Sequence, residues 1–303
     1  MFEKILVPLD GSQLAELALQ PALAIARHSG SKITLLNVPV RQQVVLPSSA
    51  GYGPPIYERT AEYALKREEQ YLARMQDENA DPNIEFDIKL EEGDVAGVIV
   101  DTAVGCEADL ILMTTHGYSG FTRWMLGSVT ERVLRHAPCP VLVIRRGGEL
   151  KKSLITLDGS RLAEQALSPG IEIGRLLGCE TSLIRVDQEE KLSSVEMGFL
   201  EVASSDLCQD LSLEDADRVS YYLDCVSNQF GTEDYPLGKA VVRGKPAESI
   251  LKYIDEHGIG LVAIATHGYG GLKRWTYGSV MEKILRKADC AMLVVRPPTE
   301  ALN

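Results

Sequence analysis

Two glycine-bearing segments of the chain have the residue types that bind a phosphate chain. The segment at 113–129 reads MTTHGYSGFTRWMLGSV, and the segment at 264–280 reads IATHGYGGLKRWTYGSV. Glycine lets backbone N–H groups approach phosphate oxygens closely, because it has no side chain to hold the backbone away. A helix that begins just after such a loop points its partly positive N-terminus at the same anion. The two segments therefore predict an anion site in each half of the chain.

Each segment ends in a Gly-Ser pair that could begin a helix: Gly127-Ser128 in the first half and Gly278-Ser279 in the second. A serine at this place can cap the helix or donate to an anion, so an ordinary helix cap is the structural alternative. THGY, then Gly, Arg-Trp and GSV recur at identical spacing in both halves. This recurrence indicates an internal duplication and favours the binding hypothesis.

The duplication extends to the first apolar run of each half, where KILVPLDGS at 4–12 matches KSLITLDGS at 152–160. Open parallel sheets bind ligands beyond the carboxyl ends of their strands, where the strand order reverses. Asp10 and Asp158 follow the first strand of each half, and the glycine segments follow the fourth, so both features converge on one crevice per half. An aspartate there could accept from a ribose hydroxyl or an adenine amino group. The structural alternative is an Asp-Gly-Ser turn that caps a helix.

Strands and helices alternate along the chain and indicate an α/β fold, with a parallel sheet between two layers of helices. In the first half we expect strands at 3–9, 32–40, 84–90, 109–113 and 140–144, and helices at 13–29, about 57–79, 94–106 and 128–136. In the second half the equivalent segments are 152–160, 161–177, 181–186, 215–230, 239–244, 244–258 and 260–296. Pro21 could kink the helix expected at 13–29. The acidic, serine-rich segment 187–217 has no counterpart, and is interpreted either as a solvated loop or as a cover for the second pocket.

Length and charge narrow the classes of function. A chain of 303 residues predicts about two domains, with the boundary at the linker 146–151 and domains at 1–147 and 148–303. The net charge of −12 argues against nucleic acid as a general partner and against an acidic membrane surface. No apolar run approaches the roughly 20 residues of a membrane span. The N-terminus MFEKILVPLDGS lacks the features of a signal peptide, so we expect a cytoplasmic protein.

The cysteines and histidines do not predict a metal site. The six cysteines include no C-x-x-C pair, and Cys139 and Cys290 are interpreted as small buried hydrophobes rather than metal ligands or redox thiols. His116 and His267 have no second histidine or cysteine at ligand spacing. A magnesium ion would enter only with a bound triphosphate.

Three blocks of the first half, at 5–12, 93–117 and 127–145, resemble the universal stress protein family. The chain is similar to two such domains in tandem over nearly its full length, apart from about 187–235. The resemblance implies two five-stranded parallel-sheet domains of the Rossmann-like, adenine nucleotide alpha hydrolase-like kind. It also implies internal pairing of the domains through their last strands, and leaves a further homodimer open. Some members bind ATP or related adenine nucleotides, and others do not.

The resemblance implies a set of nucleotide-contacting residues in each half. The set is Pro8, Asp10, Val38, Met113, Thr114, Gly117, Gly127, Ser128 and Val129 in the first half, and Asp158, Val186, Gly268, Gly278 and Ser279 in the second. The first glycine of the family motif is replaced by Thr114 and by Ala265, whose side chains could narrow the phosphate cradle, although Thr114 could contribute its hydroxyl. Pro8 becomes Thr156 in the second half, so the first half is predicted to be the better site. Arg123 and Arg274 could neutralise phosphate or lie solvated beside a tryptophan.

Three functions follow from the residues and the resemblance. The first is a cytoplasmic stress-response protein that binds ATP, or AMP or ADP in its place. The second is a stress protein that binds no nucleotide and acts through protein partners. The third is a slow ATP hydrolase. We predict no catalytic residue, because His116 is the nearest general base by sequence and no partner carboxylate is evident.

Overall fold

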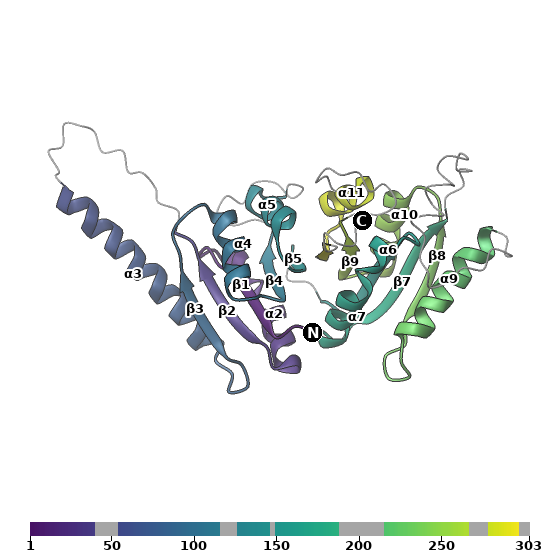
Figure 1. The fold of residues 1–303 in the computed structure, drawn as a ribbon, viewed down its shortest axis with the longest axis horizontal. Helices are drawn as coiled ribbons and strands as arrows, with labels where there is room; N and C mark the ends of the chain where they lie inside the picture. The colour runs from purple at the N-terminus through teal and green to yellow at the C-terminus, as the bar shows by residue number, and fades with distance from the viewer. Residues whose placement is uncertain (40–53, 116–125, 146–148, 188–214, 267–277, 297–303) are drawn as a thin grey trace. The chain divides into compact units, whose positions relative to one another are not determined.

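The computed structural model describes residues 1–39, 54–115, 126–145, 149–187, 215–266 and 278–296. The chain divides into two compact units, one of Phe2–Gly120 with Gly127–His136, and one built on Ala137–Asn303 (Figure 1). The two units are described separately below.

The first unit contains four parallel strands in the order β3-β2-β1-β4. The strands are β1 Lys4–Pro8, β2 Lys32–Asn37, β3 Phe86–Leu90 and β4 Leu110–Thr114. The helices are α1 Gln13–Glu16, α2 Leu19–Ser29, α3 Pro54–Glu78, α4 Val95–Gly105 and α5 Ser128–His136. The strand order reverses at β1, because β2 and β4 flank it on opposite sides.

The second unit repeats this plan and adds two strands. Its strand order is β5-β10-β9-β6-β7-β8. The strands are β5 Val141–Ile144, β6 Lys152–Leu157, β7 Glu180–Asp187, β8 Gly238–Arg243, β9 Leu261–Ala265 and β10 Ala291–Val295. The helices are α6 Arg161–Glu164, α7 Leu167–Leu176, α9 Asp215–Phe230, α10 Pro246–His257 and α11 Ser279–Lys287.

One pair of strands in the second unit is antiparallel. β5, the last strand of the first sequence repeat, pairs with β10, the last strand of the second, with Val143 opposite Met292. The other pairs in this unit are parallel. Pairing of the last strands, expected from the family resemblance, is therefore present between β5 and β10.

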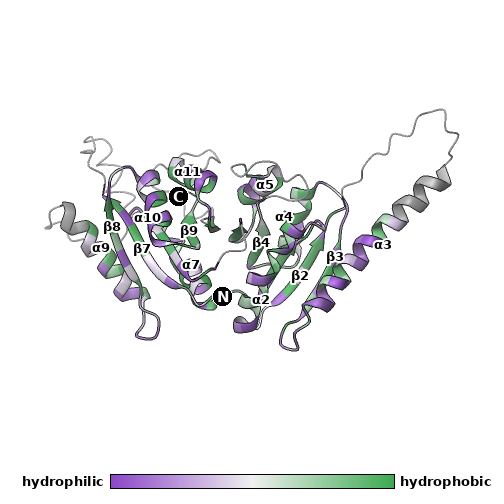
Figure 2. Ribbon diagram, turned by 180° about the vertical axis from the view of Figure 1, so that it is seen from behind, coloured by the Kyte–Doolittle hydropathy of each residue, from purple (hydrophilic) through white to green (hydrophobic). Residues whose placement is uncertain are grey.

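The core of each unit consists of apolar strands covered by helices. Every residue of β4, β5, β9 and β10 is buried, and for the parallel strands β4 and β9 this is expected when helices cover both faces of the sheet. The central strands, such as β4 and β9, are mostly hydrophobic, whereas β7 and the helices carry a mixture of hydrophobic and hydrophilic residues (Figure 2). The predicted α/β fold class is confirmed.

The single helices predicted at 13–29 and 161–177 are wrong. Each is two helices, with α1 ending at Glu16 and α2 beginning at Leu19, and the same break between α6 and α7. Pro21 is the third residue of α2, and Pro169 is the third residue of α7. Proline has no N–H for the carbonyl four residues earlier, and its ring crowds that carbonyl. A proline is tolerated only in the first turn, so a new helix begins just before it.

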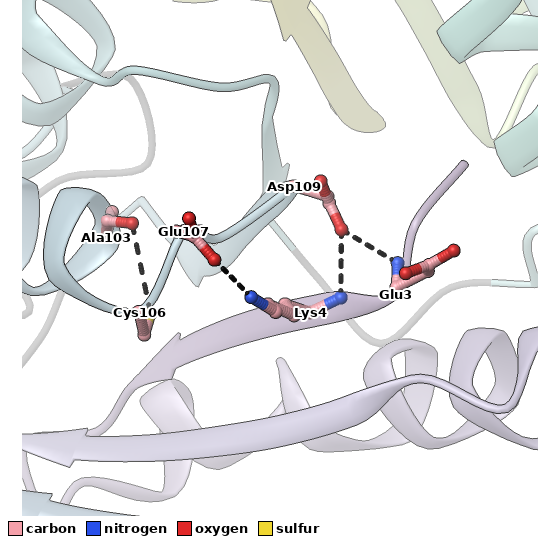
Figure 3. Close-up of polar contacts among 6 residues, drawn as sticks. All are labelled: Glu3, Lys4, Ala103, Cys106, Glu107 and Asp109. Carbon is pink, nitrogen blue, oxygen red and sulfur yellow. Dashed lines mark hydrogen bonds and ion pairs between the residues drawn. The ribbon is translucent and has the colours of Figure 1, made fainter.

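The amino edge of the first sheet is held by charged groups (Figure 3). Asp109 Oδ2 accepts hydrogen bonds from the backbone N–H groups of Glu3 at 2.9 Å and Lys4 at 3.1 Å. Lys4 Nζ forms an exposed ion pair with Glu107 Oε2 at 2.6 Å. These contacts fasten the start of β1 to the start of β4, and they lie at the opposite end of the strands from the predicted site.

The structure also bears on the membrane question. Among the helices of the described residues, none combines the length and the apolar character that a membrane crossing requires. Most of the acidic segment predicted at 187–217 lies outside the described residues.

Candidate functional site

The carboxyl ends of β1 and β4 meet at one edge of the first sheet. Ile5 pairs with Leu110 and Leu6 with Ile111, so the two strands run side by side in the same direction. Asp10 follows β1, and α5 follows β4 after the glycine segment. This edge is the point at which the strand order reverses, which is where open α/β sheets bind ligands.

Asp10 forms the turn that sequence reasoning gave as its structural alternative. Its Oδ1 accepts hydrogen bonds from Ser12 N at 3.0 Å and Ser12 Oγ at 2.6 Å. Ser12 Oγ in turn accepts from Ala15 N at 3.1 Å and caps α1. Gly11 has a φ of +81°, a conformation that favours glycine. Asp10 is nonetheless exposed at the edge, so a structural role and contact with a ligand are compatible.

Asp158 forms the same turn in the second repeat. Ser160 N and Oγ donate to its Oδ1 at 2.9 and 2.6 Å, and Ser160 caps α6 through Ala163 N at 3.1 Å. The two turns therefore match closely in hydrogen bonding, which makes Asp158 a matched control for Asp10.

Gly127 closes the glycine segment against the end of β4. Its N–H donates to the carbonyl oxygen of Thr115 at 2.9 Å. A Cβ atom built on Gly127 would lie 2.6 Å from the same oxygen, closer than real Cβ atoms approach. Ser128 begins α5 and is exposed. Close backbone packing at this position thus requires glycine, and it leaves the start of α5 open at the carboxyl edge.

Thr130 fixes this arrangement and was missed by sequence reasoning. Its buried hydroxyl donates to the carbonyl oxygens of Thr114 at 3.0 Å and Thr115 at 3.2 Å. The bonds connect the first turn of α5 to the residues that end β4. The repeat comparison gives no signal for this role, because the equivalent residue in the second half is Met281, which cannot donate.

The second repeat closes its glycine segment more loosely. Gly278 N donates to Thr266 O at 3.1 Å, but a Cβ atom on Gly278 would lie 3.7 Å from that oxygen, at ordinary contact distance. Met281 is buried and apolar. Ala265, which ends β9, is buried as well. The loop entry of the first repeat is therefore the more constrained of the two.

The remaining predicted residues divide into those described and those outside the described residues. Val38, Met113 and Thr114 are buried, and Pro8, Val129 and Val186 are partly buried. Gly117, His116, Arg123, Gly268, His267 and Arg274 lie outside the described residues. The structure thus brings Asp10, Gly127 and Ser128 to the same edge of the first sheet, while the middle of each glycine segment stays a sequence prediction.

An amide and a carboxylate lie behind the Asp10 turn. Asn37 Nδ2 donates to Leu9 O at 2.9 Å and to Glu68 Oε2 at 3.3 Å, and Arg67 pairs with Glu68 at 2.7 Å. Burial, followed by the Glu16 carboxylate, raises the pKa of nearby Tyr71. The first-repeat edge therefore carries several carboxylates beside its neutral amide.

Cys290 is buried, as predicted, whereas Cys139 is only partly buried. Burial raises the pKa of the Cys179 thiol to about 11 and that of the Cys290 thiol to about 12. Cys106, Cys139, Cys179 and Cys290 are not in disulfide bonds, whereas Cys225 in α9 is disulfide-bonded. Among the described residues, no group of three or more histidine, cysteine or acidic side chains could hold a metal ion.

Comparison with known proteins gives a consistent result. A model described as the universal stress protein family matches residues 1–145 and again residues 149–296. The chain is 31% identical over 147 residues to universal stress protein MJ0531 of Methanocaldococcus jannaschii, over 48% of this chain and 84% of that protein. It is 28% identical over 196 residues to universal stress protein Rv2005c of Mycobacterium tuberculosis, over 63% of this chain and 62% of that protein.

A solved structure matches both repeats together. The crystal structure of a universal stress protein from Archaeoglobus fulgidus has a TM-score of 0.69 at 18% sequence identity. The match covers 97% of this chain and 98% of that one. At this sequence identity the similarity shows a shared fold, and the match includes both repeats.

Proposed function

The chain belongs to the universal stress protein family, and from that premise we propose that it is a stress-response protein that binds ATP or a related adenine nucleotide. The proposed site is the carboxyl edge of the first repeat. The second repeat is proposed to bind the same ligand weakly or not at all. The second-repeat counterparts of the residues in the first-repeat site are Asp158, Val186, Gly268, Gly278 and Ser279.

The packing of Gly127 is the observation that carries this proposal. A Cβ atom there would meet Thr115 O at 2.6 Å, so the backbone at the entry to α5 approaches its surroundings as closely as a backbone can. Glycine-bearing loops that lead into a helix cradle phosphates with N–H groups, and the partly positive helix terminus favours the negative charge. We propose that the N–H groups of Gly117 and Ser128 hold the phosphates in this way. Gly127, whose own N–H donates to Thr115 O, would set their position, and Val129 lies in the first turn of the helix.

The base and ribose would lie at the end of β1. Asp10 is exposed there and can accept from a ribose hydroxyl or an amino group. Pro8, Val38 and Met113 supply apolar surface beside it. Thr114 replaces a glycine of the family motif, but its carbonyl is already fixed by Thr130. The phosphates of the bound nucleotide would be the anion at the start of α5, and a magnesium ion would bind to those phosphates.

The proposal also covers the association of the two domains and the cellular location. The β5–β10 pair is proposed to be the contact through which the two domains, 1–147 and 148–303, associate within one chain. A cytoplasmic location is also proposed. Thiol labelling of Cys225 in intact cells tests it, because disulfide bonds are uncommon in reducing compartments.

The decisive experiment is a calorimetric titration of the full chain with Mg-ATP, on wild type and on two matched variants. We expect one site per chain. Asp10→Asn removes a charged acceptor and should weaken binding about tenfold, which corresponds to about 1.4 kcal/mol. Asp158→Asn alters an equivalent turn in the second repeat and should leave the affinity unchanged.

Thermal unfolding provides an independent measurement. ATP at about 100 times its dissociation constant should stabilise the wild type by about 2.7 kcal/mol. Two equal sites would contradict the ranking of the repeats. If neither heat nor stabilisation is observed, the chain acts without nucleotide, through protein partners, and the substitution of glycine by Thr114 and Ala265 is the reason. Phosphate release above a trace rate would favour the ATP hydrolase hypothesis.

A further inference from the structure

Arg185 occupies a position at the carboxyl edge of the second repeat that no sequence motif indicates. It lies in β7 and pairs in register with Leu157, the last residue of β6. Asp158, Gly159 and Ser160 form the turn that follows β6. Arg185 is therefore beside the second-repeat counterpart of the Asp10 turn.

The guanidinium of Arg185 is held between this turn and an aromatic ring. Its Cζ lies 4.9 Å from the centre of the Tyr222 ring, which is a cation–π contact. A Cβ atom on Gly159 would lie 2.9 Å from Cζ and Nη1 and 3.0 Å from Nη2. Gly159 also has a φ of +84°, a conformation that favours glycine, so the guanidinium lies against backbone that carries no side chain. The side chain is thus fixed in place on two sides.

The Tyr222 ring is itself fixed. Tyr222 lies in α9, its side chain is buried, and its hydroxyl donates to Glu164 Oε1 at 2.8 Å. Burial and the Glu164 carboxylate raise the pKa of Tyr222, so the hydroxyl stays protonated and keeps donating. Glu164 is therefore occupied by Tyr222, and the ring forms a rigid platform for the guanidinium.

The N–H donors of Arg185 have no acceptor within the described part of the chain. A guanidinium carries five donors in a planar fork. Neighbouring arginines of the same unit are paired: Arg243 with Asp187 at 3.4 Å, and Arg175 with Glu172 at 2.7 Å. Arg185 is partly exposed, so its donors can reach a ligand. A preorganised guanidinium of this kind matches the geometry of a phosphate or carboxylate group.

The first repeat has the opposite chemistry at the same place. Asn37 is the residue equivalent to Arg185, and its amide nitrogen already donates to Leu9 O and Glu68 Oε2. Glu68 places a carboxylate 3.9 Å from the position that a Cβ of Gly11 would occupy, where the second repeat has the guanidinium. A negatively charged group placed directly beside this turn would therefore meet a carboxylate in the first repeat and a guanidinium in the second.

We propose that Arg185, fixed on the Tyr222 ring beside the Asp158–Ser160 turn, is the anchor of an oxyanion site in the second repeat. The ligand is a small molecule that presents a phosphate or a carboxylate group at this edge. The proposal does not depend on nucleotide binding in the first repeat. Under it, the duplicated chain carries two sites of different chemistry rather than a working site and an idle copy.

The test uses NMR on the full chain labelled with ¹⁵N, with sodium phosphate and sodium acetate as separate probes. The Arg185 Nε–Hε resonance is assigned by its loss in Arg185→Lys. We expect this resonance and the amide signals of Gly159 and Ser160 to shift saturably with at least one probe. Sodium chloride at matched ionic strength should not reproduce the shift. The probe that acts identifies whether phosphate or carboxylate is the preferred group.

Two variants make the result decisive. Arg185→Asn introduces the first-repeat residue, and it should weaken the response of the Gly159 and Ser160 amides at least tenfold. Arg243→Asn, a change to a paired arginine on β8, should alter it less than twofold. An unchanged response in Arg185→Asn, or equal shifts with chloride, would overturn the proposal. Because the probes contain no nucleoside, failure of nucleotide binding would leave this result unaffected.

Discussion

Replacing Gly127 by alanine should destabilise the chain, whereas the same change at Gly278 should not. In the first repeat the new methyl group would lie 2.6 Å from Thr115 O, against 3.7 Å from Thr266 O in the second. The first contact is about 0.6 Å or more inside an ordinary carbon–oxygen contact of roughly 3.2 Å or longer, so the backbone at the start of α5 must move. The two glycines are matched in sequence context, so the comparison isolates this distance.

The size of the effect follows from the contacts that move. Overpacking of this kind costs about 1–3 kcal/mol, and weakening the hydrogen bond from Gly127 N to Thr115 O adds about 0.5–1.5 kcal/mol. The lower chain entropy of alanine in the unfolded state returns about 0.4–1 kcal/mol. The net loss expected for Gly127→Ala is about 1–3 kcal/mol. For Gly278→Ala, an N-cap position without a steric conflict, the expected change is within about 0.5 kcal/mol.

Denaturant unfolding followed by circular dichroism measures both variants, and Mg-ATP titration adds a second readout. Gly127→Ala should lower the free energy of unfolding and weaken nucleotide binding. Gly278→Ala should change neither. Equal stability losses in the two variants would refute the steric argument, as would a wild-type-like Gly127→Ala. A stability loss without any change in nucleotide affinity would keep the steric argument and refute the phosphate role of Gly127.

Three further predictions concern residues outside the glycine pair. Thr130→Val removes a buried hydroxyl that donates to two carbonyls and should cost about 1–2 kcal/mol in denaturant unfolding, while Thr130→Ser, which keeps the donor, should cost less; equal losses would contradict the bonding role. Cys290 has a pKa of about 12 against an ordinary 9.0, so iodoacetamide at pH 8 should leave it unlabelled in mass spectrometry. Because the folded-state pKa is the higher one, the Cys290 thiol should favour the folded state below about pH 9 and lose that effect as the pH rises toward 12, measured by unfolding across this range. Lys4→Ala breaks an exposed pair at the amino edge and should shift neither the unfolding midpoint nor ATP affinity.

Sequence periodicity and the internal repeat predicted most of the architecture. Buried parallel strands are continuous apolar runs, so β1, β4, β9 and β10 were recognisable from composition alone. Pro21 and Pro169 also indicate an interruption in the first helix of each repeat. The sequence alone does not distinguish one kinked helix from two separate helices, because these differ only in how far the chain bends. The structure decides between them because α2 begins two residues before Pro21.

The details of the candidate sites could not be predicted in the same way. Gly127 and Gly278 are both followed by Ser-Val, and they differ by about an ångström in the distance from a built Cβ atom to a carbonyl oxygen. Thr130 acts through a hydroxyl whose partners are backbone atoms some fifteen residues earlier, which no local pattern reveals. Arg185 lies in a strand, and its significance depends on Tyr222 in a distant helix. These contacts depend on tertiary packing, whereas propensities and motifs report local chemistry.

Because β5 pairs with β10, the sequence repeats and the compact structural units have different boundaries. By sequence, β5 closes the first copy, yet by contacts it belongs with the second, so the repeat boundary and the structural boundary differ by one strand. A fragment cut at the repeat boundary would carry β5 without β10 and expose the edge of β10 on its sibling fragment, and unpaired edges promote aggregation. A cut just before Ala137 keeps both strands together. The two copies are therefore not interchangeable modules, because the last strand of the first copy pairs with the last strand of the second.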